Sequence, residues 1–154
     1  MAAGTFVIAN KAKLNLFSAT NLAGQATYTN YKLALCVSTF TPVGTEEVWA
    51  DISANELANG NGYTTGGAAC TAGSLAGTVG TVTFSLTWAG PTWTASGAGI
   101  PAWKYAILRY SGTLNSKVDP IMGWFEGNSG STVALTAAGN TITVTDPSGI
   151  WTAT

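Results

Sequence analysis

The chain has 154 residues, of which 46% are hydrophobic and only 8% are charged, and its formal net charge is -1. That length fits one domain with a real hydrophobic core, and a composition rich in apolar residues and poor in charge is not that of a disordered chain. The surface is therefore expected to consist of Thr, Ser, Asn, Gly and Ala, which are cheaper to desolvate than ions. Nucleic acid is not an expected partner, because phosphate binding needs clustered cations and the basic residues are scattered: Lys11, Lys13, Lys32, Lys104, Arg109 and Lys117.

The start of the chain and the lack of a long apolar run indicate a protein that is made in the cytoplasm and has no membrane as a partner. No apolar run approaches the roughly 20 residues of a membrane span. The start, Met1 to Phe6, lacks the basic and long apolar regions of a signal peptide. Cys36 and Cys70 are then expected to be free thiols, with a disulfide between them as the alternative.

Short strands are predicted along the whole chain, because apolar alternation fills the gaps between turn-forming residues. In the clearest strand, the positions of Val82, Phe84, Leu86 and Trp88 alternate with those of Thr and Ser. Asn59-Gly60 and Asn61-Gly62 are predicted to be positive-φ turns. In chain order the predicted strands number about eight: Lys13–Phe17, Tyr31–Val37, Thr81–Trp88, Trp103–Tyr110, Pro120–Glu126, Thr132–Thr136, Thr141–Thr145 and Gly149–Thr152.

A single short helix is predicted over Ile52–Ala58. Ser53 is expected to cap it, with Glu56 three residues later completing a capping box, and Gly60 is expected to stop it. Together with the strands, this predicts an all-β, antiparallel β-sandwich with a jelly-roll-like topology, spanning residues 1–154 as one domain.

The edge strands of such a sheet could pair with strands of other chains, since few charges are present to prevent this. Coverage of these edges in an assembly would explain this, and so would a sandwich that covers its own edges with loops. Residues 1–13 are expected either to extend as an arm that adds a strand to a neighbour, anchored by Phe6, Val7 and Ile8, or to form an ordinary first strand of the domain.

The residue types that most often carry catalysis are missing or isolated. The chain has no histidine, which is the commonest general base and metal ligand. The prediction is therefore a protein that is not an enzyme and has no catalytic, cofactor-binding or metal-binding residues. A facing Asp51/Glu126 pair of the glycosidase type remains open. The glycine-rich segment 60–67 lacks the Lys-Ser/Thr ending of a phosphate-binding loop and indicates a structural turn.

Six tryptophans are many for a chain of this length. Trp93, Trp103 and Trp124 fall near strand ends or loops, where an exposed ring can anchor a protein interface or stack on a sugar. Packing in the core is the other interpretation. Trp93, Trp103 and Trp124, together with Phe6, Val7 and Ile8, are the candidate contact residues.

The segment from Trp49 to Ala68 carries an Asn-Glu-Leu, then an Asn-Gly-Tyr, then a Gly-Gly, ahead of a Thr/Val-rich strand. Through these motifs residues 45–154 resemble small virion proteins of tailed bacteriophages. Four later segments continue the likeness: Thr92–Gly97, Ala106–Tyr110, Pro120–Phe125 and Gly149–Trp151. The chain departs from the family pattern after Tyr110, where Ser111-Gly112-Thr113 stands in place of an acidic stretch.

The resemblance implies a structural component of the particle, located in the virion and synthesised in the host bacterial cytoplasm. The specific expectation is a capsid decoration (cement) protein whose partners are the major capsid protein and copies of itself, as a trimer or another homo-oligomer. No cofactor is expected. The alternative is a tail or fibre module that recognises a host-surface glycan.

Overall fold

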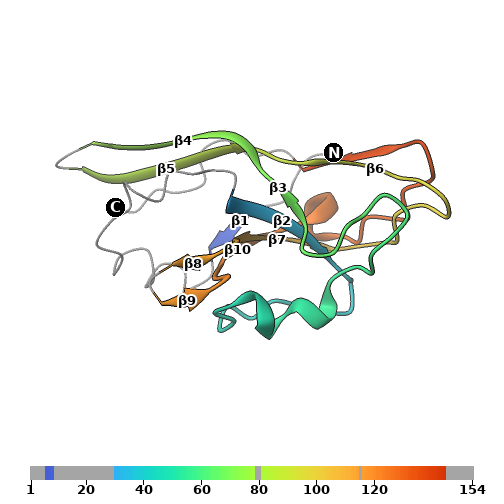
Figure 1. The fold of residues 1–154 in the computed structure, drawn as a ribbon, viewed down its shortest axis with the longest axis horizontal. Helices are drawn as coiled ribbons and strands as arrows, with labels where there is room; N and C mark the ends of the chain where they lie inside the picture. The colour runs from blue at the N-terminus through green and yellow to red at the C-terminus, as the bar shows by residue number, and fades with distance from the viewer. Residues whose placement is uncertain (1–5, 9–29, 79–80, 115, 145–154) are drawn as a thin grey trace.

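The structure, a computed structural model, describes residues 6–8, 30–78, 81–114 and 116–144. Its regular elements are antiparallel strands and three short 3-10 helices, which confirms the predicted all-β class. At the centre lies one sheet with the strand order β1-β10-β7-β2-β3. These strands are β1 (Phe6–Ile8), β10 (Ile121–Glu126), β7 (Tyr105–Tyr110), β2 (Tyr31–Cys36) and β3 (Ala68–Ala69) (Figure 1).

The central sheet is covered on both faces. Every residue of β7 is buried, and β2 is buried at all positions but Lys32. Leu33, Leu35 and Leu108 belong to one apolar cluster, whereas Ala34 and Ile107 belong to a second one. Because neighbouring residues of a strand point to opposite faces, the two clusters lie on opposite sides of the sheet. Continuous apolar runs are typical of strands that are buried on both faces.

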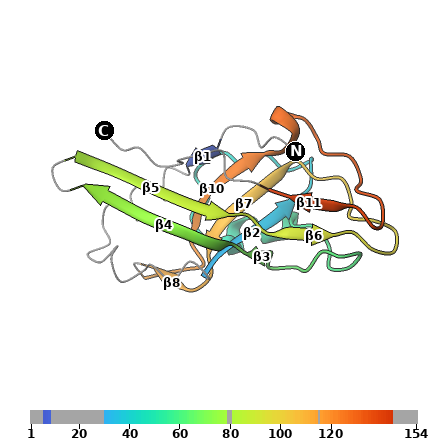
Figure 2. The same ribbon diagram turned by 90° about the horizontal axis from the view of Figure 1, so that it is seen from above.

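An upper layer of strands lies over the face of the central sheet that carries the first cluster (Figure 1). This layer contains the hairpin of β4 (Thr71–Thr78) with β5 (Thr81–Ala89), and the pair β6 (Thr92–Thr94) with β11 (Thr141–Thr143) (Figures 1 and 2). Trp93 and Ile142 pair across β6 and β11 and are buried in that cluster. A small hairpin, β8 (Thr113–Leu114) with β9 (Lys117–Val118), follows β7.

The segment over the second cluster does not form the helix that was predicted for Ile52–Ala58, so that prediction is wrong. Residues 49–55 form two 3-10 turns, η3 (Trp49–Asp51) and η4 (Ser53–Asn55). Ser53 makes no capping bond. The first turn, which begins at Trp49, is held instead by Asp51, whose Oδ2 accepts from the amides of Glu47 at 2.9 Å and Val48 at 3.0 Å. After the turns, Glu56 and Leu57 run as extended backbone beside the end of β2, since Leu57 N donates to Leu35 O and Val37 N donates to Asn55 O. Long-range pairing therefore overrides the local helical pattern.

Five predicted strands coincide closely with observed ones: those at Tyr31–Val37, Thr81–Trp88, Trp103–Tyr110, Pro120–Glu126 and Thr141–Thr145. The strand predicted at Thr132–Thr136 is wrong, since this segment makes only isolated bridges, Trp103 to Val133 and Ile100 to Thr136. A third 3-10 helix, η5 (Gly127–Gly130), precedes it. The predicted strands Lys13–Phe17 and Gly149–Thr152 lie outside the described residues.

The turn predictions are confirmed at Gly60, Asn61 and Gly62, which have φ of 128°, 54° and 93°. At the start of the chain, β1 pairs with β10 of the same chain, from Phe6 opposite Phe125 to Ile8 opposite Gly123. Residues 6–8 are thus an ordinary strand of this fold. The rest of the predicted arm, residues 1–5 and 9–13, lies outside the described residues.

Candidate contact surface

The three candidate tryptophans are not on the surface, which corrects the prediction of contact residues. Trp93, Trp103 and Trp124 are only 4%, 2% and 8% exposed. Trp93 lies with its ring centroid 6.0 Å from that of Tyr63. Trp103 is enclosed through its bridge with Val133. The core interpretation therefore holds for these side chains, because their large apolar area is what closes the two faces of the central sheet.

Of the remaining candidates, Val7 is 39% exposed on the edge strand β1. Its role in contacts stays a prediction. For Phe6 and Ile8 the structure describes the backbone pairing with β10, and their side chains lie outside the description.

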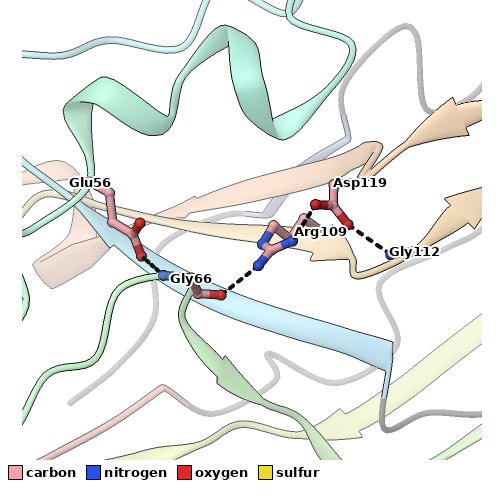
Figure 3. Close-up of polar contacts among 5 residues, drawn as sticks. All are labelled: Glu56, Gly66, Arg109, Gly112 and Asp119. Atoms are coloured by element: carbon pink, nitrogen blue, oxygen red, sulfur yellow. Dashed lines mark hydrogen bonds and ion pairs between the residues drawn. The ribbon is translucent and has the colours of Figure 1, made fainter.

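Arg109 is the one buried charged side chain in the described part of the chain, with 5% of its surface exposed. Its Nη2 donates to the Gly66 carbonyl at 2.8 Å, and its Nη1 lies 3.3 Å from Asp119 Oδ2 (Figure 3). Its Cζ lies 5.2 Å from the centroid of the Trp49 ring, a cation–π arrangement. Arg109 thereby joins the central sheet to η3 and to the loop that leads into β3.

Two carboxylates extend this network along the backbone. Asp119 Oδ1 accepts from Gly112 N at 2.7 Å, and Glu56 Oε1 accepts from Gly66 N at 2.7 Å (Figure 3). Glu56 Oε1 also accepts from the Tyr63 hydroxyl at 2.6 Å. Both carboxylates are thus directed at the main chain or at a neighbouring side chain, and the buried guanidinium reaches no open surface. The arrangement is that of a structural clamp.

The carboxylates Asp51 and Glu126 do not form a facing pair. Asp51 lies beside the start of β10, since Ile121 N donates to Glu47 O and Val48 bridges Pro120, whereas Glu126 ends that strand. Five residues of extended strand place the two positions about 17 Å apart, beyond the separation of glycosidase carboxylates. The hydrogen bonds from Val48 and Glu47 lower the pKa of Asp51, as suits a turn-capping carboxylate.

Charged residues are unevenly distributed between the upper layer of strands and the opposite face of the central sheet. Residues 57–103 contain no charged residue, and neither does β11, so the strands of the upper layer are uncharged in sequence. The charged residues of the central strands lie on the opposite face: Lys32 shares its face with Ala34, Arg109 with Ile107, and Glu126 with Trp124. Glu46, Glu47 and Asp51 belong to the segment on that same side.

Three loops next to these uncharged strands meet at one end of the molecule, beside β6 and β11 (Figure 2). We call residues 58–65, 94–99 and 136–141 the neutral tip. Ser96 N donates to Asn61 O at 3.0 Å, and Ala98 N donates to Asn61 Oδ1 at 3.2 Å. Ala95 N donates to Asn140 O and Gly139 N to Ala95 O, each at 2.8 Å. The loops therefore form one continuous surface of Gly, Ala, Ser, Thr and Asn.

Sequence reasoning identified the low charge but missed the neutral tip and the Arg109 clamp. A lone arginine inside the apolar strand YAILRY, and the long interval between Glu56 and Lys104, were the available signals. Within the described residues, no group of three or more His, Cys, Asp or Glu could hold a metal ion, and no helix is long and apolar enough to cross a membrane. No family model matches this sequence, and no curated protein or solved structure is significantly similar to it.

Proposed function

We propose that this chain is a non-enzymatic structural protein of a tailed-phage virion, and that it decorates and stabilises the capsid through surface contacts. The observation that carries the proposal is that, among the residues the structure describes, the strands of the upper layer and the neutral tip carry no charged side chain. Burying neutral groups avoids the penalty of burying ions, so such a side suits a protein packed among neighbours. The resemblance to small virion proteins supplies the biological setting.

The stabilising mechanism is thermodynamic. A protein that binds only the assembled shell favours that shell by mass action, in proportion to its free concentration over its Kd. The partners are then the major capsid protein and further copies of this chain, arranged as trimers or as bridges between neighbouring capsomers. The protein is synthesised in the bacterial cytoplasm and ends in the virion.

The glycan-binding alternative has less support. Sugar rings stack on exposed aromatic faces, and the three candidate tryptophans, Trp93, Trp103 and Trp124, are buried. Their burial removes these three rings as a stacking platform among the described residues.

The test is to add the purified protein to phage particles that lack it. The expected result is saturation at a copy number set by the symmetry of the capsid, together with greater heat resistance of the shell. Binding without saturation, or unchanged heat resistance, would overturn the proposal. Specific binding to the host cell surface in place of the particle would favour the glycan module.

A further inference from the structure

Resting on the proposed function, we propose that the neutral tip is the end of the molecule that docks on the shell. We further propose that the surface it meets is an uncharged patch of the capsid protein. The other end and the charged face would then point away from this contact. This assigns a polarity to the bound molecule and a chemistry to its partner.

The first argument is that the neutral tip is already ordered for binding. Asn61 holds the 94–99 loop through its main-chain carbonyl and its side chain, and Ala95 exchanges two main-chain bonds with residues 139 and 140. Gly62 lies so close to Thr94 that a Cβ at this position would overlap the Thr94 carbonyl. Loops that are fixed in this way lose little conformational freedom on binding, which removes one of the main costs of association.

The second argument concerns the side chains that the neutral tip presents. Asn59, Thr64, Ala98 and Ala138 are exposed and short, and Gly and Ala lose no rotamer freedom on burial. Leu135, which adjoins the tip, is 56% exposed and lies against Gly99. One apolar side chain beside a ring of small neutral groups is the composition of a small protein contact, with Leu135 as its anchor.

The chemistry of the neutral tip selects the class of partner. It carries no cation for phosphate or anionic lipid. Its one aromatic ring, Tyr63, is 2% exposed, and the adjoining Trp93 is 4% exposed, so neither offers a stacking face for a sugar. Its exposed side chains include those of Asn59 and Thr64, whose amide and hydroxyl groups an uncharged protein surface can satisfy through direct and water-mediated hydrogen bonds.

The experiment introduces one positive charge at a time. Ala98→Lys and Ala138→Lys place the charge in the neutral tip, and Ala50→Lys places the same charge at an exposed position of η3 on the charged side. Binding to particles that lack the protein is measured at low and at high salt, after the unfolding free energy of each variant is shown to match the unmodified chain. Both tip variants are expected to bind about tenfold more weakly or worse, because a desolvated charge is left unpaired. Ala50→Lys and the unmodified chain are expected to bind alike, with little dependence on salt.

The outcomes separate this inference from the proposed function. If the unmodified chain binds and saturates but the tip variants bind as well as Ala50→Lys, the neutral tip is not the docking end. The proposed decoration function would still stand. Binding that weakens steeply with salt would overturn the inference that the partner surface is uncharged. Competition by free glycan would show that the tip binds a sugar, and the inference of a protein partner would be wrong. Failure of the unmodified chain to bind would overturn the proposed function itself.

Discussion

Arg109 shows how much structure one side chain can hold in a chain with so few charges. Its guanidinium contacts the Gly66 carbonyl, the Asp119 carboxylate and the Trp49 ring, which come from three separate segments. The Nε and Nη1 atoms have no well-aligned hydrogen bond among the described residues, so the contact with Asp119 is an ion pair more than a directed bond. The Asp119 side chain is 33% exposed, and solvent weakens that pair.

Replacing Arg109 by methionine should therefore destabilise the fold by about 2 kcal/mol, mainly through the loss of the Gly66 bond and of the packing on Trp49. The control is Lys117→Met, which removes the exposed Lys117–Glu47 ion pair. It should cost less than about 0.5 kcal/mol. Urea unfolding measures both. Equal losses for the two variants would show that the clamp contributes no more than a surface pair.

The two cysteines are free and buried, which confirms the prediction of free thiols. Burial raises the pKa of Cys36 to about 12, with a smaller contribution from the nearby Glu56 charge, and burial alone raises the pKa of Cys70 to about 12. Since the thiolate is the reactive form, both should resist iodoacetamide in the folded protein and react once it is unfolded. Mass spectrometry after brief labelling checks this. Rapid labelling of either thiol in native buffer would contradict its burial.

Among the elements, those whose pattern and tertiary environment agree were predictable. β2, β7 and β10 are dense in Leu, Ile, Tyr and Phe, and any sheet would bury them. β4 was missed because TAGSLAGT is rich in Ala and Gly, and only its pairing with β5 gives it a strand conformation. The helix at residues 52–58 failed for the converse reason. Its local pattern is favourable, but the hydrogen bonds with the edge of β2 are formed by residues far away in the sequence.

The entry into β3 supplies a test at the scale of the element. Gly67 has φ of 74°, and a Cβ there would lie 2.1 Å from the Leu33 carbonyl oxygen in the neighbouring strand. Gly139 has φ of 85° with nothing within 4 Å of the same position. Gly139→Ala should then cost about 1–2 kcal/mol, from the left-handed backbone alone. Gly67→Ala should cost clearly more, because β3 must also move away from β2. Thermal or urea unfolding compares them, and equal losses would contradict this close approach.

For the whole molecule, the sequence shows that charge is scarce but not how it is arranged. The interval between Glu56 and Lys104 is visible in the sequence. That this interval produces a continuous uncharged surface depends on the fold, because the neutral tip is formed by residues as far apart in the sequence as Asn61 and Asn140. The candidate tryptophans failed for a related reason. A tryptophan near a strand end is exposed or buried according to the layer that covers it, and Val133 and Ile142 belong to segments whose placement is long-range.

Alkaline pH should destabilise the whole molecule, because three buried acids keep their protons in the folded state. The pKa of Cys36 and of Cys70 is raised from 9.0 to about 12. Burial, assisted by the bond to Glu56, raises the pKa of Tyr63 well above its usual value of 10.0. A raised pKa in the folded state gives stability that is complete below the unfolded pKa and is lost as the pH rises toward the folded one. The free energy of unfolding should therefore be level below pH 9 and fall above it.

Each thiol should contribute a loss of about 1.4 kcal/mol per pH unit once the unfolded thiol is ionised, so two thiols should make the decline steep. Urea unfolding at a series of pH values measures it. The double variant Cys36→Ala, Cys70→Ala is the matched control, since it starts from a lower stability but should show a shallower alkaline decline, with the remaining slope assigned to Tyr63. Parallel curves for the two proteins would mean that the thiols ionise alike in both states, and the burial of Cys36 and Cys70 on opposite faces of the central sheet would then be wrong.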